Sequence, residues 1–176
     1  MTTTEKRRIA VHEAGHAVCA LLLGRRMSCA IGEDCGWTDI SPEPGLEPDY
    51  WQTSDRARQV ERDPADLQTL LDDAVLYASG AAAESMVKGA LSGRDVIVRG
   101  SDADLIERAA AAFLEKYPNV EAVGCFKQMA AASAVRLLGP HIASVRAVAD
   151  ALYRERRLSA ARVAEIHTGT QKVKSS

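Results

Sequence analysis

Two histidines and a glutamate stand within five positions of an otherwise apolar segment, "IAVHEAGHAVCA" at residues 9–20. On a helix, His12 and His16 are four residues apart and therefore lie on one face, a turn from each other. This spacing lets both imidazoles bind one zinc ion, and Glu13 can act on a water molecule at the metal without binding it. Gly15 is unfavourable inside a helix by about 1 kcal/mol relative to alanine, which indicates that something else needs close approach there.

A catalytic zinc site needs a third protein ligand and keeps a fourth position for water. The other two histidines, His141 and His167, are expected in surface or capping roles, so we expect a carboxylate as the third ligand. Spacing alone does not choose among the candidates, which are Glu84, Asp95, Asp102, Asp104 and Glu107.

The elements that would position these residues are mostly helices. Thr2 and Glu5 have the spacing of a capping box, and Gly24 is placed to end the first helix. Short strands are expected at 27–31 and 37–40, joined by a hairpin loop at 32–36. Further helices are expected at 66–88 and 101–117, followed by two or three more with breaks at 139–140 and 158–159.

The expected fold is therefore mainly α (α+β), with a small β-hairpin or sheet beside the HExxH helix and a C-terminal helical bundle. We expect one domain over 1–176, with the metal site in residues 1–115, a helical part in 116–168 and a frayed tail in 169–176. The segment Ser41–Pro64 is rich in proline and acid and is expected to form a long loop. Trp37, Tyr50 and Trp51 lie in this region, where they could either grip a substrate or cover the core.

Composition excludes several classes of protein. Hydrophobic residues make up 47% and charged residues 26% of the 176 residues, as in globular domains. The net charge of −2 argues against a nucleic-acid binder. The longest apolar run, Ala17–Leu23, is too short to span a bilayer, and no signal peptide is recognisable. Without an export signal or a CxxC pair, we expect a cytoplasmic protein with reduced thiols at Cys19, Cys29, Cys35 and Cys125.

Several segments resemble the zinc peptidase domain of the FtsH-type AAA proteases, in the same order along the chain from Glu5 to about Ile166. "EKRRIAVHEAGHAV" is similar to the opening of that domain, and "GWT" at 36–38 to its Gly-aromatic-Thr strand. "YASGAAAE" at 77–84 resembles its Gly-Gly-Arg-Ala-Ala-Glu helix, although alanine replaces the arginine. "GSDADLIERA" at 100–109 resembles its Gly-Ala-Ser-Asn-Asp-Leu segment, and 141–166 resembles its closing helices.

The resemblance implies a zinc-dependent endopeptidase with one Zn²⁺ per chain. Matching the motifs gives His12, His16 and Asp104 as the metal ligands and Glu13 as the catalytic base, with Glu84 as the second choice for the third ligand. Peptide substrate is expected to pair with the strand that contains Gly36, Trp37 and Thr38.

The resemblance also implies a hexameric ring, but the family's ATPase module is not recognisable here, because no GxxxxGK[ST] phosphate loop occurs. The expected activity is therefore ATP-independent in itself and directed at unfolded or flexible segments, unless a separate ATPase delivers substrates. The alternative is a non-catalytic, zinc-stabilised module that docks onto a partner protein such as that ATPase. A DNA-binding helix pair in 139–166 is a weaker alternative because the charge pattern does not support it.

Overall fold

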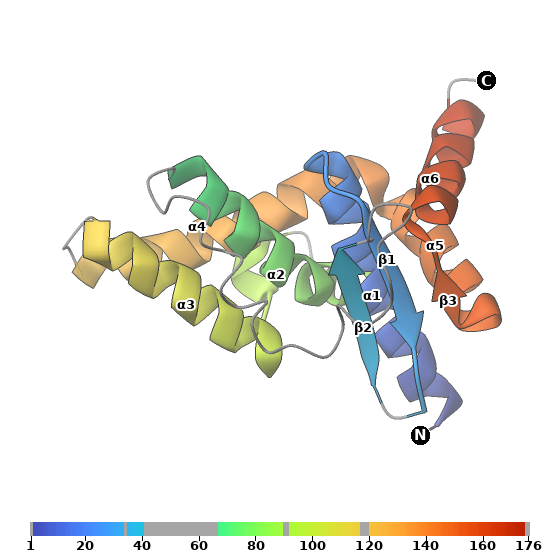
Figure 1. Ribbon diagram of the computed structural model, residues 1–176, viewed down its shortest axis with the longest axis horizontal. Helices are drawn as coiled ribbons and strands as arrows, with labels where there is room; N and C mark the ends of the chain where they lie inside the picture. Colours follow the sequence, from blue (N-terminus) through green and yellow to red (C-terminus); the bar gives the residue numbers. More distant parts are fainter. Residues whose placement is uncertain (1, 34, 41–66, 90–91, 117–119, 175–176) are drawn as a thin grey trace.

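The computed structural model describes residues 2–33, 35–40, 67–89, 92–116 and 120–174 (Figure 1). Within these ranges helices predominate and a small antiparallel sheet packs beside the first helix, which confirms the expected mainly α fold with a small sheet. Figure 1 shows the hairpin lying along the first helix, with α3 at one end of the molecule and α6 at the other.

The elements, in chain order, are α1 (Thr3–Leu22), β1 (Met27–Ile31), β2 (Gly36–Ile40), α2 (Leu67–Val87), the 3₁₀ turn η3 (Gly93–Asp95), α3 (Ser101–Lys116), α4 (Val120–Leu138), the 3₁₀ turn η4 (Gly139–His141), α5 (Ile142–Glu155), β3 (Arg157–Leu158) and α6 (Ala160–Lys174). The expected loop at Ser41–Pro64, with Tyr50 and Trp51, lies outside the described residues.

Helix α1 forms the centre of the molecule. Its start is capped as predicted, since the Thr2 hydroxyl oxygen accepts a hydrogen bond of 3.2 Å from the backbone N–H of Glu5. From Ile9 to Ala20 nearly every residue is buried, because α2, α5 and the sheet all pack against this helix. The chain leaves α1 through Gly24, whose φ of +73° is a conformation that glycine adopts without strain.

Small residues bring α1 and α2 unusually close together. A Cβ atom on Gly15 would lie 2.5 Å from the carbonyl oxygen of Ser79 and 2.6 Å from the Cβ of Ala83. This contact confirms the close approach that a glycine inside the first helix predicts. The core around it is rich in alanine, and the buried residues of both halves of the chain belong to one hydrophobic cluster.

The sheet has the strand order β2-β1-β3, and all of its pairs are antiparallel. The hairpin agrees with the sequence prediction, and its register places Cys29 opposite Thr38. Strand β3 was not predicted; it is only two residues long, and Leu158 pairs with Cys29 on the other side of β1. Among the strands that the structure describes, β2 is therefore an edge, and it lies next to α1.

The C-terminal helices are longer than the sequence suggests. The break at Gly139–Pro140 occurs as predicted, at η4. The expectation of a frayed tail over 169–176 is wrong for its described part, because α6 continues to Lys174. Side-chain hydrogen bonds hold this end to α5: Thr170 and Gln171 both bond to the hydroxyl group of Ser144. None of the described helices is long and apolar enough to cross a membrane.

Candidate metal centre

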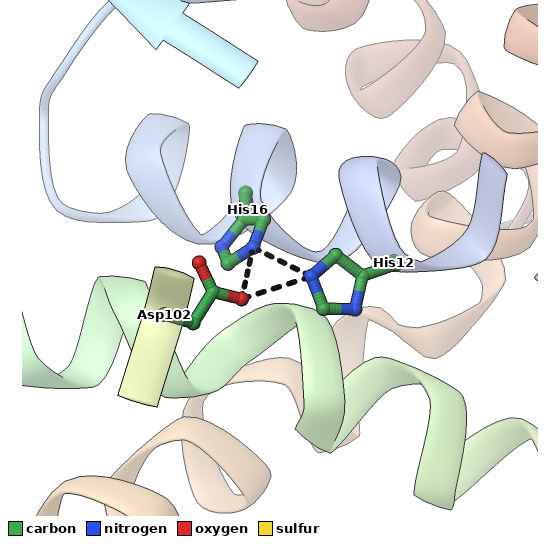
Figure 2. A group of neighbouring side chains, drawn as sticks. All are labelled: His12, His16 and Asp102. Carbon is green, nitrogen blue, oxygen red and sulfur yellow. Dashed lines mark hydrogen bonds and ion pairs between the residues drawn. The ribbon is translucent and has the colours of Figure 1, made fainter. Parts of the chain in front are cut away.

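The two histidines of the HEAGH segment point toward each other and toward one carboxylate. Figure 2 shows His12 and His16 on α1 facing Asp102, which lies in the first turn of α3. The Nε2 atoms of the two imidazoles are 3.1 Å apart. The Oδ2 atom of Asp102 lies 2.9 Å from Nε2 of His12 and 3.2 Å from Nε2 of His16. Among the described residues this is the group of side chains that could hold a metal ion.

The third member of this group differs from the residue that the motif match selected. Asp104, which the motif match selected, is exposed to solvent, whereas Asp102 is partly buried against the histidines. The reason is helical geometry: α3 begins at Ser101, and two residues separated by two positions project about 200° apart around a helix. Only one of the two aspartates can therefore face α1.

The other acidic candidates have different partners. Glu84 contacts His12 on the ring nitrogen that faces away from Asp102. Asp95 accepts a hydrogen bond from the hydroxyl group of Ser92, and Glu107 pairs with Lys127. Asp102 is thus the candidate whose carboxylate meets both imidazoles.

Hydrogen bonds fix the orientation and the tautomer of both histidines. Nδ1 of His12 donates to Oε1 of Glu84 at 2.8 Å, and Nδ1 of His16 donates to the carbonyl oxygen of Leu76 at 2.8 Å. Since a carboxylate and a carbonyl oxygen accept hydrogen bonds, each neutral ring carries its hydrogen on Nδ1. Both Nε2 atoms are then left with lone pairs, as a metal ligand requires.

Three atoms that carry lone pairs therefore converge within hydrogen-bonding distance of one another. Such an arrangement is repulsive unless a proton or a cation lies between them. In the protein alone a proton takes this role: burial disfavours the charged imidazole, but the hydrogen bonds to Asp102 and Glu84 outweigh it and raise the pKa of His12 to about 9. Burial likewise opposes ionisation of Asp102, but its contacts with the two histidines lower its pKa below the usual value.

The spacing of these atoms fits a zinc ion. Donor atoms about 2.0–2.1 Å from a tetrahedral zinc are separated by about 3.3 Å, within a few tenths of an ångström of the separations here. Gly80 of α2 leaves the room that the imidazoles occupy. A Cβ atom there would lie 2.5 Å from Nε2 of His16 and 2.6 Å from Nε2 of His12. The residues present therefore fit the metal predicted from the sequence.

Glu13 lies beside this group and is 6% exposed. The hydroxyl group of Thr38 donates a hydrogen bond of 2.7 Å to its Oε2 atom, which connects the carboxylate to β2. Gly36 allows this approach, since a Cβ atom there would lie 2.6 Å from the Cγ and 2.8 Å from the Oε1 of Glu13. Burial raises the pKa of Glu13 above its usual value, although the nearby histidines and Thr38 oppose the shift.

A cleft of about 850 Å³ borders His12 and Glu13. Its lining includes His12, Glu13, Gly36 and Glu84, so one of the three converging residues, the buried glutamate and the start of β2 border the same space. His16 and Asp102 are not among its lining residues. Trp37, the next residue of β2, is 46% exposed. The structure thus brings together the predicted residues of α1 and β2.

Two contributing residues escaped the sequence prediction. Gly80 carries a signal that could have revealed it, because a glycine among alanines in a helix is unfavourable unless something approaches closely. Leu76 acts through its backbone carbonyl oxygen, which no residue type reveals.

No protein-family model matches this chain, and no curated protein does so either.

Proposed function

We propose that the protein is a zinc-dependent endopeptidase that hydrolyses peptide bonds in unfolded or flexible segments, as the resemblance to the FtsH-type peptidase domain suggests. The observation that carries the proposal is the convergence of His12, His16 and Asp102 beside the buried carboxylate of Glu13, with His12 and Glu13 lining a cleft open to solvent. A site of purely structural zinc would normally be closed by four protein ligands and would need no base.

The three converging residues would hold the ion, and Glu84 and Leu76 would orient the imidazoles. When bound there, zinc supplies Lewis-acid activation of a water molecule and of the peptide carbonyl group. The carboxylate of Glu13 is placed to receive a proton from the attacking water and to deliver it to the leaving amine. The hydrogen bond from Thr38 to Oε2 holds the carboxylate in this orientation.

Strand β2 supports the proposed binding of an extended peptide. It is an edge of the sheet formed by the described strands, and its first residue lines the cleft. A peptide that adds to this edge would place its backbone along Gly36–Thr38, with a side chain against the exposed indole ring of Trp37. An extended chain is required for this pairing, and a folded substrate is protected by a stability of about 5–15 kcal/mol.

The test compares zinc content and cleavage of an unfolded protein such as casein. Zinc-loaded wild type should bind one zinc per chain and cleave. Glu13→Gln should retain the zinc and lose at least about 100-fold in rate, because it removes the base. His12→Ala should lose both. The matched control is Glu115→Gln at an exposed position of α3, which should behave as wild type.

Two results would reject the proposal. Cleavage by Glu13→Gln at the wild-type rate would remove the assigned role of the base. A zinc-loaded wild type that cleaves no unfolded protein would favour the alternative of a zinc-stabilised docking module.

A further inference from the structure

One wall of the cleft is formed by an extended segment before α3. Residues 96–99 are in neither a helix nor a strand, and their side chains alternate between two environments. Val96 and Val98 pack against the hydrophobic core, whereas Ile97 and Arg99 line the cleft. Ile97 is 66% exposed, which is unusual for a large apolar side chain next to a cavity. This alternation presents an apolar and a cationic side chain to whatever occupies the cleft.

The charges in the cleft are unequally satisfied. Of the carboxylates that line it, Glu84 pairs with Arg8 and His12, whereas Glu13 and Asp95 accept hydrogen bonds from the uncharged hydroxyl groups of Thr38 and Ser92. Lys88, at the end of α2, and Arg99 also line it, but neither forms an ion pair with any residue that the structure describes. The cleft thus offers two cations without an anionic partner in these ranges, beside one exposed isoleucine.

We propose that this wall selects the substrate: it favours extended peptide segments in which an acidic side chain lies next to an apolar one. Lys88 and Arg99 receive the carboxylate, and Ile97 contacts the apolar side chain. Charge complementarity supports this occupant, because a basic side chain placed at Lys88 or Arg99 would meet a like charge. The inference rests on the proposed endopeptidase function and adds the chemical class of its substrate.

The expected preference is moderate. An exposed ion pair changes affinity by up to about fivefold, so two cations together give roughly a tenfold preference for an acidic over a neutral side chain. Salt should reduce it, because the screening length falls from about 10 Å at 0.1 M to about 3 Å at 1 M.

The experiment uses three peptides that differ only in a Glu, Gln or Lys beside a leucine. Their binding to zinc-loaded Glu13→Gln protein is measured by fluorescence anisotropy, and wild-type kcat/KM is measured in parallel. Lys88→Glu with Arg99→Glu should reverse the order of the peptides. The control has the same change in charge on the exposed face of α5, Arg146→Glu with Arg154→Glu. This control should bind the three peptides in the wild-type order.

The two measurements separate this inference from the proposed function. Equal binding of the three peptides to the Glu13→Gln protein, or the same reversal in the α5 control, would overturn the inference. Cleavage without a charge preference would also overturn it and leave the endopeptidase function intact. Selective binding of the acidic peptide without any cleavage by wild type would support the recognition wall and reject the enzyme.

Discussion

Gly80→Ala is the substitution that most directly tests the geometry of the metal centre. The added methyl group would lie 2.5 Å from Nε2 of His16 and 2.6 Å from Nε2 of His12. An ordinary van der Waals contact needs about 3.4 Å, so each ring is too close by nearly 1 Å. The rings cannot rotate away without breaking the 2.8 Å hydrogen bonds that their Nδ1 atoms make to Glu84 and Leu76.

The size of the expected loss in zinc affinity follows from how little zinc–ligand distances can vary. Ligand distances in zinc sites stay within about 0.2 Å of their ideal values, and a displacement near 1 Å removes a ligand. Disturbing a residue that merely orients a ligand already weakens binding about 10–100-fold. Displacing a ligand itself should therefore raise the zinc Kd by at least about 100-fold.

A competition assay with a chromophoric chelator measures this Kd, and circular dichroism checks the fold. Gly124→Ala is the matched control, because Gly124 is an exposed helical glycine with nothing within 4 Å of its Cβ position. That variant should keep the wild-type Kd and gain about 0.5–1 kcal/mol of stability, as alanine favours the helix. Wild-type zinc affinity in a folded Gly80→Ala protein would refute the placement of the two imidazoles against α2.

Three further predictions concern the same centre. Asp102→Ala should weaken zinc binding at least about 100-fold, because it removes a ligand, while Asp104→Ala should not; the reverse result in the chelator assay would return the third ligand to Asp104. Gly36→Ala should keep the zinc but lose cleavage, because its methyl group displaces the side chain of Glu13. Undiminished casein cleavage would contradict this displacement of Glu13. Zinc affinity should rise by up to tenfold per pH unit until the pH reaches about 9, as zinc displaces the proton of His12.

The stability of the metal-free protein changes with pH in the opposite direction to the zinc affinity. The pKa of His12 is raised to about 9 from its ordinary value of 6.5, so the protonated ring stabilises the metal-free fold fully below pH 6.5. That contribution is lost as the pH rises toward 9, in the range where the zinc-loaded protein gains affinity. The difference in melting temperature between the zinc-loaded and the metal-free protein should therefore be larger at pH 8.5 than at pH 7. An equal difference at the two pH values would contradict a proton on His12 in the metal-free protein.

The sequence by itself determined the local features of the protein. The spacing of His12 and His16 places them on one helical face regardless of the rest of the fold, since helical periodicity is a property of the backbone. The same local rules predicted the cap at Thr2, the hairpin, and the break at Gly139–Pro140. The unfavourable Gly15 indicated that another segment packs closely there, although not which one.

Only the tertiary structure decided which distant groups complete the site. The choice between Asp102 and Asp104 depends on how α3 is rotated against α1, and a motif match cannot fix a rotation of about 200°. The hydrogen bond from His16 to a backbone carbonyl and the contact of Gly80 with both rings arise from the packing of α2. Sequence periodicity sets which face of a helix is apolar, whereas side-chain packing between helices sets which atoms meet.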